Sequence, residues 1–175
     1  VLAAFIFLAQ INNSNLQDIL VYQMLSSTLS QYIEDPSFLK RFALKLFFIS
    51  VAMRKAAFDG KIDYIPTHLS QIPALFASKR IGLDVALVQV SPPDKFGYCS
   101  LGVSVDITRS RLENVPLVIA QVNTHMPRTW GDSFVHVDAL DYLILKDEPL
   151  VEALPSPKNE EVASRIGYYV SQLVD

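Results

Sequence analysis

The chain has 175 residues, half of them hydrophobic, and a formal net charge of −3. This length fits one domain, and the hydrophobic content is sufficient for a sizeable core. The negative charge argues against nonspecific binding to nucleic acid, because no surplus of cations is available to neutralise phosphates. The single cysteine excludes an internal disulfide and fits a reducing compartment, so we expect a cytoplasmic protein.

The N-terminal segment, VLAAFIFLAQI, is apolar but has only eleven residues. A membrane-spanning helix needs about 20 residues, and this segment also lacks the basic region and cleavage site of a signal peptide. We therefore expect a buried core helix that ends at Asn12 and Asn13, and no association with a membrane. Because the chain does not begin with methionine, we expect that Val1 is not the natural start.

The first half of the chain alternates short apolar runs with helical patterns. Residues 16–25 predict a strand centred on Ile19–Val21, followed by a loop in which Pro36 opens a short helical turn. The next expected elements are a strand at 44–51, a helix at 52–60 with Gly60 as its C-cap, a short strand at 62–65 and a helix at 68–80.

The second half contains three near-continuous apolar runs, which are typical of strands covered on both faces. They lie at residues 83–90, 116–122 and 141–147. A helix is expected at 105–114, and a last helix at 159–174 has its apolar residues at helical spacing. Strands that alternate with helices predict an α/β fold with an open, mostly parallel sheet flanked by helices, in one domain.

Two long loops follow the strands at 83–90 and 116–122, at residues 91–104 and 123–136. Both exceed the usual strand-to-helix length of about 2 to 6 residues. In open parallel sheets, ligands lie beyond the carboxyl ends of the strands, and right-handed crossovers bring those ends to one edge. We therefore expect the two loops to lie side by side, with Met126–Thr129 facing Gly97–Gly102.

The nucleophile and metal-ligand candidates in these loops are weak. Cys99 is either a nucleophile with His125 or His136 as its base, or a small buried hydrophobic residue. GYCSLG around Ser100 does not meet the G-x-S-x-G spacing of a nucleophile turn. His68, His125 and His136 lack metal-ligand spacing, so we expect no metal site. No glycine motif for phosphate binding is present.

Arg128, in MPRTWGDS, is a stronger candidate. A guanidinium in a loop at the strand ends could pair with a carboxylate or a phosphate. The alternative is a salt bridge to Asp132 or Asp138 that only holds the loop. The sequence leaves both roles open.

Four segments resemble the N-terminal domain of the acetyl-CoA hydrolase/transferase family, which includes 4-hydroxybutyrate and acetate CoA-transferases. They are DYIPTHLSQIPALF, LDVALVQVSPPDKFGYCSLGVSVD, VIAQVNTHMPRTWGDSFVHV and DYLILKDEPL. The resemblance runs from about Leu16 to Asp175, whereas residues 1–15 match poorly. It implies that a first strand and a small Gly-rich turn precede Val1.

The resemblance implies transfer of coenzyme A between carboxylates, or hydrolysis of the acyl-CoA. A glutamate attacks the thioester, and acyl-anhydride and glutamyl-CoA thioester intermediates follow. In the family that glutamate and a Gly-rich CoA-binding segment lie in a following domain. We therefore expect residues 1–157 to be an N-terminal domain that is incomplete at its start, and residues 158–175 to be a helix leading to the catalytic domain. None of Glu113, Glu152, Glu160 and Glu161 is assigned the catalytic role.

By the same resemblance, the two loops form one wall of a cleft between two domains, and Phe96 supplies apolar surface there. The expected substrate-binding residues are Gly97, Tyr98, Cys99, Ser100, Gly102, Met126, Pro127, Arg128 and Thr129. We expect no catalytic residue and no bound cofactor in this chain alone, with coenzyme A as a substrate of the full-length enzyme. The expected partners are the C-terminal domain, acyl-CoA, a small carboxylate and further copies of the chain. The alternative is a noncatalytic binding or scaffold module of the same fold.

Overall fold

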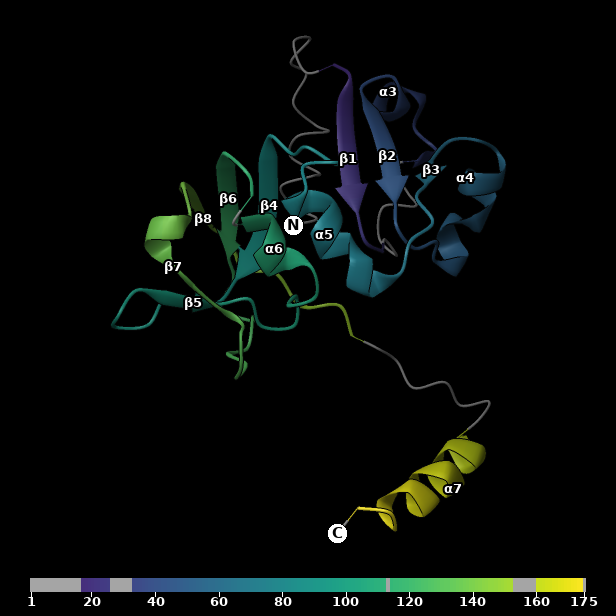
Figure 1. Cartoon of the computed structure of the whole chain (residues 1–175), viewed down its shortest axis with the longest axis vertical. Coiled ribbons are helices and arrows are strands. Elements are labelled where there is room, and N and C mark those ends of the chain that lie inside the picture. The colour runs from purple at the N-terminus through teal and green to yellow at the C-terminus, as the bar shows by residue number, and fades with distance from the viewer. Residues whose placement is uncertain (1–16, 26–32, 113, 153–159, 175) are drawn as a thin grey trace.

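The computed structural model describes residues 17–25, 33–112, 114–152 and 160–174 (Figure 1). Its strands form two three-stranded parallel sheets and one two-stranded antiparallel sheet. The α/β class with mostly parallel strands flanked by helices is therefore confirmed, although the parallel strands are divided between two sheets. The helix expected at residues 1–13 lies outside the described residues.

The first sheet contains β1 (Ile19–Gln23), β2 (Phe42–Leu46) and β3 (Asp63–Tyr64), in that order. Its core includes Phe42, Leu44 and Leu46, which alternate along one face of β2. The strand expected at 44–51 thus begins two residues earlier and ends at Leu46, because the next residue, Phe47, packs in a different cluster.

The second sheet contains β4 (Val85–Val90), β6 (Leu117–Val122) and β8 (Tyr142–Leu145), with β6 in the middle. β4 and β6 are parallel neighbours in register from Val85 opposite Leu117 to Val90 opposite Val122. Their buried residues form one core together with residues of the loops that follow the strands. The expected neighbouring positions of these two strands are therefore confirmed.

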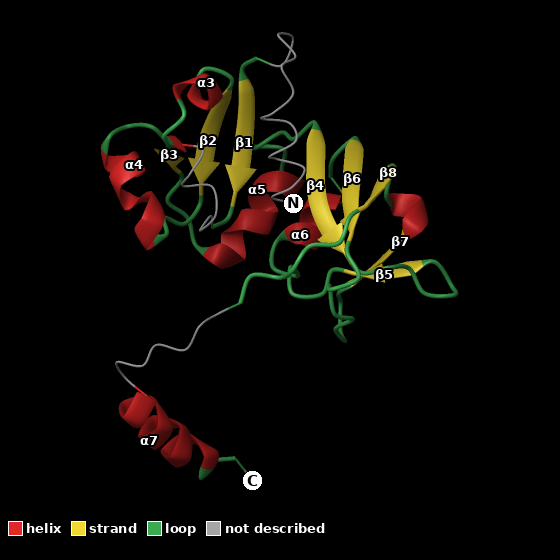
Figure 2. Cartoon of the chain, turned by 180° about the vertical axis from the view of Figure 1, so that it is seen from behind, coloured by secondary structure: helices red, strands yellow, loops and turns green. Residues whose placement is uncertain are grey.

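Two short helices, α5 (Ile72–Ala77) and α6 (Thr108–Leu112), contact each other and lie between the two sheets (Figures 1 and 2). Phe76 of α5 and Ile107 beside α6 are buried in one cluster with Phe47, which directly follows β2. This cluster connects the two helices to the first sheet. α6 is the crossover between β4 and β6.

Apart from the last helix, the remaining elements are short. They are the helices α3 (Pro36–Leu39) and α4 (Arg54–Phe58), the 3-10 helices η1 (Val51–Met53), η2 (Leu69–Gln71) and η3 (Val137–Ala139), and the strands β5 (Tyr98–Ser100) and β7 (Phe134–His136). Pro36 opens α3 as predicted, and the Asp35 side chain caps it by accepting a 2.8 Å hydrogen bond from the Ser37 amide.

β8 corrects one expectation. Its apolar run predicted a strand covered on both faces, but all four residues are exposed, from 44% at Leu143 to 82% at Leu145. The sheet order ends at β8, so within the described part of the chain this strand has a neighbour only on its β6 side. An apolar run shows that a segment is hydrophobic, but it does not show whether other elements cover the side chains of that segment.

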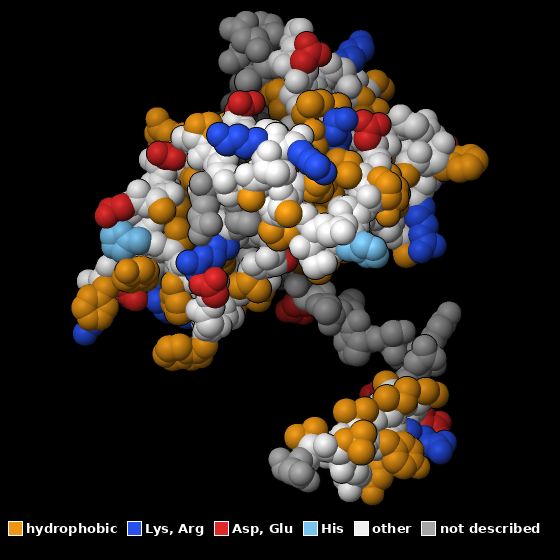
Figure 3. All heavy atoms as spheres, viewed as in Figure 1, with side chains coloured by type: hydrophobic (Ala, Val, Ile, Leu, Met, Phe, Trp, Pro, Cys, Tyr) orange, Lys and Arg blue, Asp and Glu red, His pale blue; other side chains and the backbone are white. Residues whose placement is uncertain are grey.

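The last helix is α7 (Glu160–Ser171), which confirms the helix predicted at 159–174. None of its residues is buried, and it is drawn apart from both sheets (Figure 1). Apolar side chains gather over it in Figure 3. Among the described residues, no helix has the length and hydropathy needed to cross a membrane.

Candidate functional site

The antiparallel pair β5–β7 joins the two long loops. Tyr98 lies opposite His136, and Ser100 lies opposite Phe134. Because β5 belongs to residues 91–104 and β7 to residues 123–136, the loops lie side by side beyond the adjacent strands β4 and β6. The predicted juxtaposition is therefore confirmed. Neither short strand was predicted.

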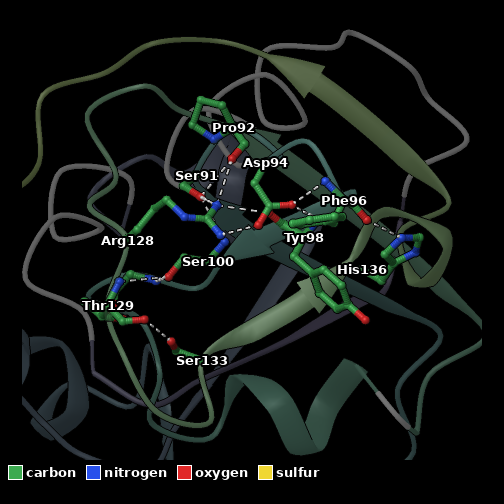
Figure 4. A network of polar contacts seen from close by, with 11 residues as sticks. Ser91, Pro92, Asp94, Phe96, Tyr98, Ser100, Arg128, Thr129, Ser133 and His136 are labelled. Carbon is green, nitrogen blue, oxygen red and sulfur yellow. Dashed lines mark hydrogen bonds and ion pairs between the residues drawn. The ribbon is translucent and has the colours of Figure 1, made fainter.

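Arg128 connects the two loops through its guanidinium (Figure 4). Nη2 lies 2.9 Å from a carboxylate oxygen of Asp94, and Nη1 donates a 2.9 Å hydrogen bond to the Tyr98 carbonyl oxygen. Longer contacts of 3.4 Å reach the Ser91 hydroxyl and the Pro92 carbonyl oxygen. We call Ser91, Asp94, Tyr98 and Arg128 the Arg128 cluster.

Asp94 organises the turn that faces Arg128. One of its oxygens accepts 2.9 Å hydrogen bonds from the amides of Phe96 and Tyr98. The Tyr98 amide first, then the Phe96 amide and the charge of Arg128, hold the pKa of the Asp94 carboxyl below its usual value. The carboxylate is therefore ionised at neutral pH, and the loop tip is fixed by charge-assisted hydrogen bonds.

One of the two roles left open for Arg128 was a salt bridge to Asp132 or Asp138, and the structure shows a different partner, Asp94. Asp132 pairs with Arg109, and Asp138 lies 3.1 Å from the His136 ring. Both acids belong to the same stretch of chain as Arg128, whereas Asp94 belongs to the other loop. The observed bridge therefore holds the two loops together, which neither of the two expected partners would do.

The two loops approach each other closely at Gly102. Its φ is +58°, a conformation that favours glycine, and a β-carbon there would lie 2.8 Å from the carbonyl oxygen of Pro127 and overlap the Met126 side chain. Thr129 donates a 3.0 Å hydrogen bond to the Gly102 carbonyl oxygen. Met126, Pro127 and Thr129 thus face Gly102 as predicted.

Ser100 and Cys99 are fully buried beneath this junction. The Ser100 hydroxyl oxygen accepts hydrogen bonds from the amides of Gly102 and Thr129, at 3.1 and 3.2 Å. Burial raises the pKa of the Cys99 thiol, which disfavours the thiolate that a nucleophile requires. Cys99 therefore packs as a small hydrophobic residue, the second of the two roles that the sequence left open.

Gly97 and Tyr98 lie at the exposed end of the junction. Gly97 has a φ of +84°, and a β-carbon there would lie 2.6 Å from Nε2 of His136. That nitrogen is 3.1 Å from the Phe96 carbonyl oxygen, and the Tyr98 ring packs edge-on against the His136 ring at 5.0 Å. Phe96 and Tyr98 keep 67% and 45% of their surface exposed, so their apolar faces remain available for contact.

The three histidines have separate surroundings. His68 precedes η2, His125 lies 3.3 Å from the side-chain oxygen of Asn123, and His136 contacts Phe96 and Asp138. In the described part of the chain, no group of three or more His, Cys, Asp or Glu residues is arranged to hold a metal ion.

Two contributors to the junction were missed from the sequence. Asp94 lies in PPDKFG, a turn composition in which an aspartate commonly accepts backbone hydrogen bonds, so the signal was present. Ser133 had no signal. It donates a 2.6 Å hydrogen bond to the Thr129 carbonyl oxygen, and its own carbonyl accepts from the Leu101 amide at 2.7 Å.

Comparison with known proteins identifies the family. Residues 4–155 match the acetyl-CoA hydrolase/transferase N-terminal domain. The chain belongs to this family. Relatives in the family include the 4-hydroxybutyrate coenzyme A transferase of Clostridium kluyveri, 45% identical over 136 residues, which are 78% of this chain and 32% of the relative. The succinyl-CoA:acetate/propanoyl-CoA:succinate CoA transferase of Fasciola hepatica is 44% identical over 68% of this chain and 25% of its own length.

Solved structures agree with the family assignment. RipA from Yersinia pestis superposes with a TM-score of 0.76 at 27% identity, over 91% of this chain and 38% of RipA. The 4-hydroxybutyrate CoA-transferase of Porphyromonas gingivalis gives a TM-score of 0.56 at 26% identity, over 93% of this chain and 43% of that one. The chain therefore spans about a quarter to a third of the curated family members named above, and less than half of these structures.

Proposed function

We propose that this chain is the N-terminal part of an acyl-CoA:carboxylate CoA-transferase or acyl-CoA hydrolase, and that the two joined loops form one wall of its active cleft. The observation that carries the proposal is the family match over residues 4–155, in which the two long loops that follow the parallel neighbours β4 and β6 are joined by the antiparallel pair β5–β7. The carboxyl edge of a parallel sheet is where open α/β folds bind ligands.

The chemistry requires a nucleophile that this wall does not supply. The family resemblance places a glutamate in a following domain, which would attack the thioester and release the CoA thiolate as an acyl anhydride forms. The thiolate would then attack the glutamyl carbonyl, releasing the first carboxylate and leaving a glutamyl-CoA thioester. In this chain Glu152, Glu160 and Glu161 are exposed and lie outside the joined loops, and Glu113 lies outside the described residues.

The role of this chain in that scheme is to hold a rigid surface against the substrate. The exposed members of the predicted site are Tyr98, Pro127 and Arg128, with Gly97 and Thr129 partly exposed. Cys99, Ser100, Gly102 and Met126 are buried and would support that surface from behind. A fixed wall lowers the entropy cost of orienting the thioester toward a carboxylate on the opposite side of the cleft.

A chimera tests the proposal. In the Clostridium kluyveri enzyme, the segment that matches this chain would be replaced by the corresponding residues of this chain, which are 45% identical. We expect the chimera to transfer CoA from acetyl-CoA to a carboxylate acceptor, and the isolated chain to show no turnover above a blank. A folded but inactive chimera would favour a noncatalytic binding module instead. Turnover by the isolated chain that survives repurification would contradict the placement of the nucleophile elsewhere.

A further inference from the structure

A pocket of about 370 Å³ lies at the carboxyl ends of the three strands of the second sheet, beside the Arg128 cluster. Its volume is in the range of small-molecule sites. Four apolar side chains from the three strand ends line it, namely those of Pro92, Pro93, Val122 and Leu145. The polar part of the lining is Thr124, Lys146 and Asp147. We call this the strand-end pocket.

The polar groups of the lining are paired within the wall itself. The Thr124 amide donates a 2.7 Å hydrogen bond to Asp147, and the Lys146 ammonium lies 3.0 Å from Glu148. The backbone of Lys146 is held as well, because its amide donates to the Val122 carbonyl oxygen at 3.1 Å. The surface left for a ligand is therefore mainly apolar.

Both sides of the pocket are held in place. On one side, the Ser91 hydroxyl donates to the Pro92 carbonyl oxygen at 3.1 Å, and the Arg128 guanidinium lies beside Pro92 (Figure 4). On the other side, the buried Asn123 donates a 2.7 Å hydrogen bond to the Glu148 carbonyl oxygen and accepts from the Glu148 amide at 3.2 Å. The pocket is thus formed before any ligand arrives, which reduces the cost of binding.

We propose that the strand-end pocket binds the hydrocarbon tail of the acyl group, with the carboxyl or thioester end directed away from Asp147. This proposal rests on the proposed function and names the part of the substrate that this chain recognises. Hydrogen bonding to Thr124 holds the pKa of Asp147 below its usual value, so the carboxylate is ionised and repels a second carboxylate. The pantetheine arm of CoA is a poorer fit, since its amides need hydrogen-bond partners and four of the seven lining residues are apolar.

Leu145 makes the pocket testable. It is 82% exposed, so a larger side chain fits there without disturbing the core, and tryptophan would fill the pocket. The matched control is Ile144→Trp, because neighbouring residues of a strand point to opposite faces and Ile144 does not line the pocket. Ile144 is also exposed, at 45%, so both substitutions are made on the surface of the same strand.

A titration of the isolated chain tests the pocket without any turnover. Sodium hexanoate should shift the methyl NMR signals of Val122 and Leu145 in a saturable way, whereas sodium acetate and free CoA should not. Leu145→Trp should abolish the shift of Val122, and Ile144→Trp should leave it. If CoA shifts these signals and hexanoate does not, the pocket binds pantetheine and the proposal is wrong. It is equally wrong if none of the three ligands shifts them.

The chimera then relates the pocket to specificity. Leu145→Trp should lower the ratio of kcat/KM for butyryl-CoA to that for acetyl-CoA by about tenfold or more, the scale set by lost burial of two methylenes. Ile144→Trp should leave the ratio unchanged. An unchanged ratio in an active Leu145→Trp chimera would overturn the proposal. A chimera without Leu145→Trp that fails even with acetyl-CoA would instead count against the proposed function, and the titration would still decide the pocket.

Discussion

At the scale of single residues, the buried members of the joined loops have structural roles. Cys99 is the middle residue of β5, and it is buried in the apolar core of the second sheet. Ser100 contacts the other loop through its hydroxyl, which accepts from the Thr129 amide, and Gly102 does so through its carbonyl, which accepts from the Thr129 hydroxyl. A substitution at these positions would therefore change the shape of the wall directly, and any contact with a substrate only through that change.

Cys99→Ala tests the nonchemical role of the thiol. In the chimera, we expect kcat to stay within about tenfold, which is a barrier change below roughly 1.4 kcal/mol. The physical reason is that Cys99 is buried and the pKa of its thiol is raised. Steady-state kinetics with acetyl-CoA would measure the effect. A thousandfold loss of kcat in a variant with unchanged melting temperature would make Cys99 a catalytic group.

Gly102→Ala tests the close approach of the loops. The added methyl group would strain a left-handed residue and overlap Met126, so we expect a loss of unfolding free energy of about 1–3 kcal/mol or more. Gly60→Ala is the control, since Gly60 has a similar φ of +70° but no atom within 4 Å of the added carbon. Urea denaturation of both variants would separate the cost of backbone strain, which both share, from the cost of the steric clash with Met126, which only Gly102→Ala has. Equal losses would show that contact with Met126 contributes nothing.

At the scale of elements, the Arg128 cluster connects the two long loops. Its ion pair joins Asp94 and Arg128, which are 34 residues apart in the sequence. Two roles for Arg128 remain to be separated. Arg128 can shape the wall through Asp94, or it can bind a carboxylate directly. Two of its guanidinium nitrogens are already engaged by Asp94 and Tyr98, which favours the first role.

A double-mutant cycle between Arg128→Ala and Asp94→Ala distinguishes the two roles. In the chimera, Arg128→Ala should reduce kcat/KM by a factor equivalent to about 1.5–3 kcal/mol, the scale of a hydrogen bond to a charged group. If Arg128 acts through Asp94, then Asp94→Ala causes a similar loss and the double variant is little worse than either single one. A harmless Asp94→Ala beside a damaging Arg128→Ala would show direct binding.

The same pair predicts a dependence of stability on pH. The pKa of Asp94 is lower in the folded chain than in the unfolded chain. Its ionised carboxylate therefore stabilises the fold at a pH above the unfolded aspartate pKa of about 4. This stabilisation is lost as the pH falls through the pKa of Asp94 in the folded chain. Thermal melts from about pH 6 downward should therefore fall less steeply for Asp94→Asn than for the unmodified chain. Lys45→Met, which removes an exposed ion pair elsewhere, is a suitable control. Identical slopes for Asp94→Asn and the unmodified chain would contradict the prediction.

The elements that sequence reasoning located correctly are those with a local signal. The apolar runs of β4 and β6 and the helical spacing of α7 each lie within one short window. β5 and β7 have three residues each and are stabilised by pairing across the two loops, so no local window contains their signal. The turn around Asp94 had a local signal, but its pairing with Arg128 joins residues that are 34 apart and was missed for the same reason. The strand-end pocket was missed because its lining comes from three separate strand ends.

At the scale of the whole molecule, α7 is independent of the two sheets. None of its residues is buried, and the large hydrophobic residues in α7 and directly after it are more than half exposed. These are Val162, Ile166, Tyr168, Tyr169, Val170, Leu173 and Val174. An isolated helix of this length is marginal in water, and the two sheets bury none of the residues of α7.

Truncation after Glu152 should therefore leave the melting temperature of the isolated chain unchanged, because α7 contributes no buried surface to the sheets. Phe76→Ala provides the contrast. Phe76 is only 2% exposed in the cluster that connects the helices to the first sheet, and its loss should cost about 3–5 kcal/mol. Differential scanning calorimetry measures both. A clear drop on truncation would show that α7 packs on the rest of the chain.

β8 has a practical consequence for anyone who produces this chain alone. Its outer edge has no strand partner among the described residues, and its four side chains are apolar and exposed. Such an edge is a template for the strand of another molecule, so concentrated solutions of the isolated chain should aggregate. A lysine in place of Ile144 would interrupt that contact and raise the solubility limit. If the longer relatives cover the same strand, the same lysine would destabilise them, and one substitution would thus have opposite effects on the short and long proteins.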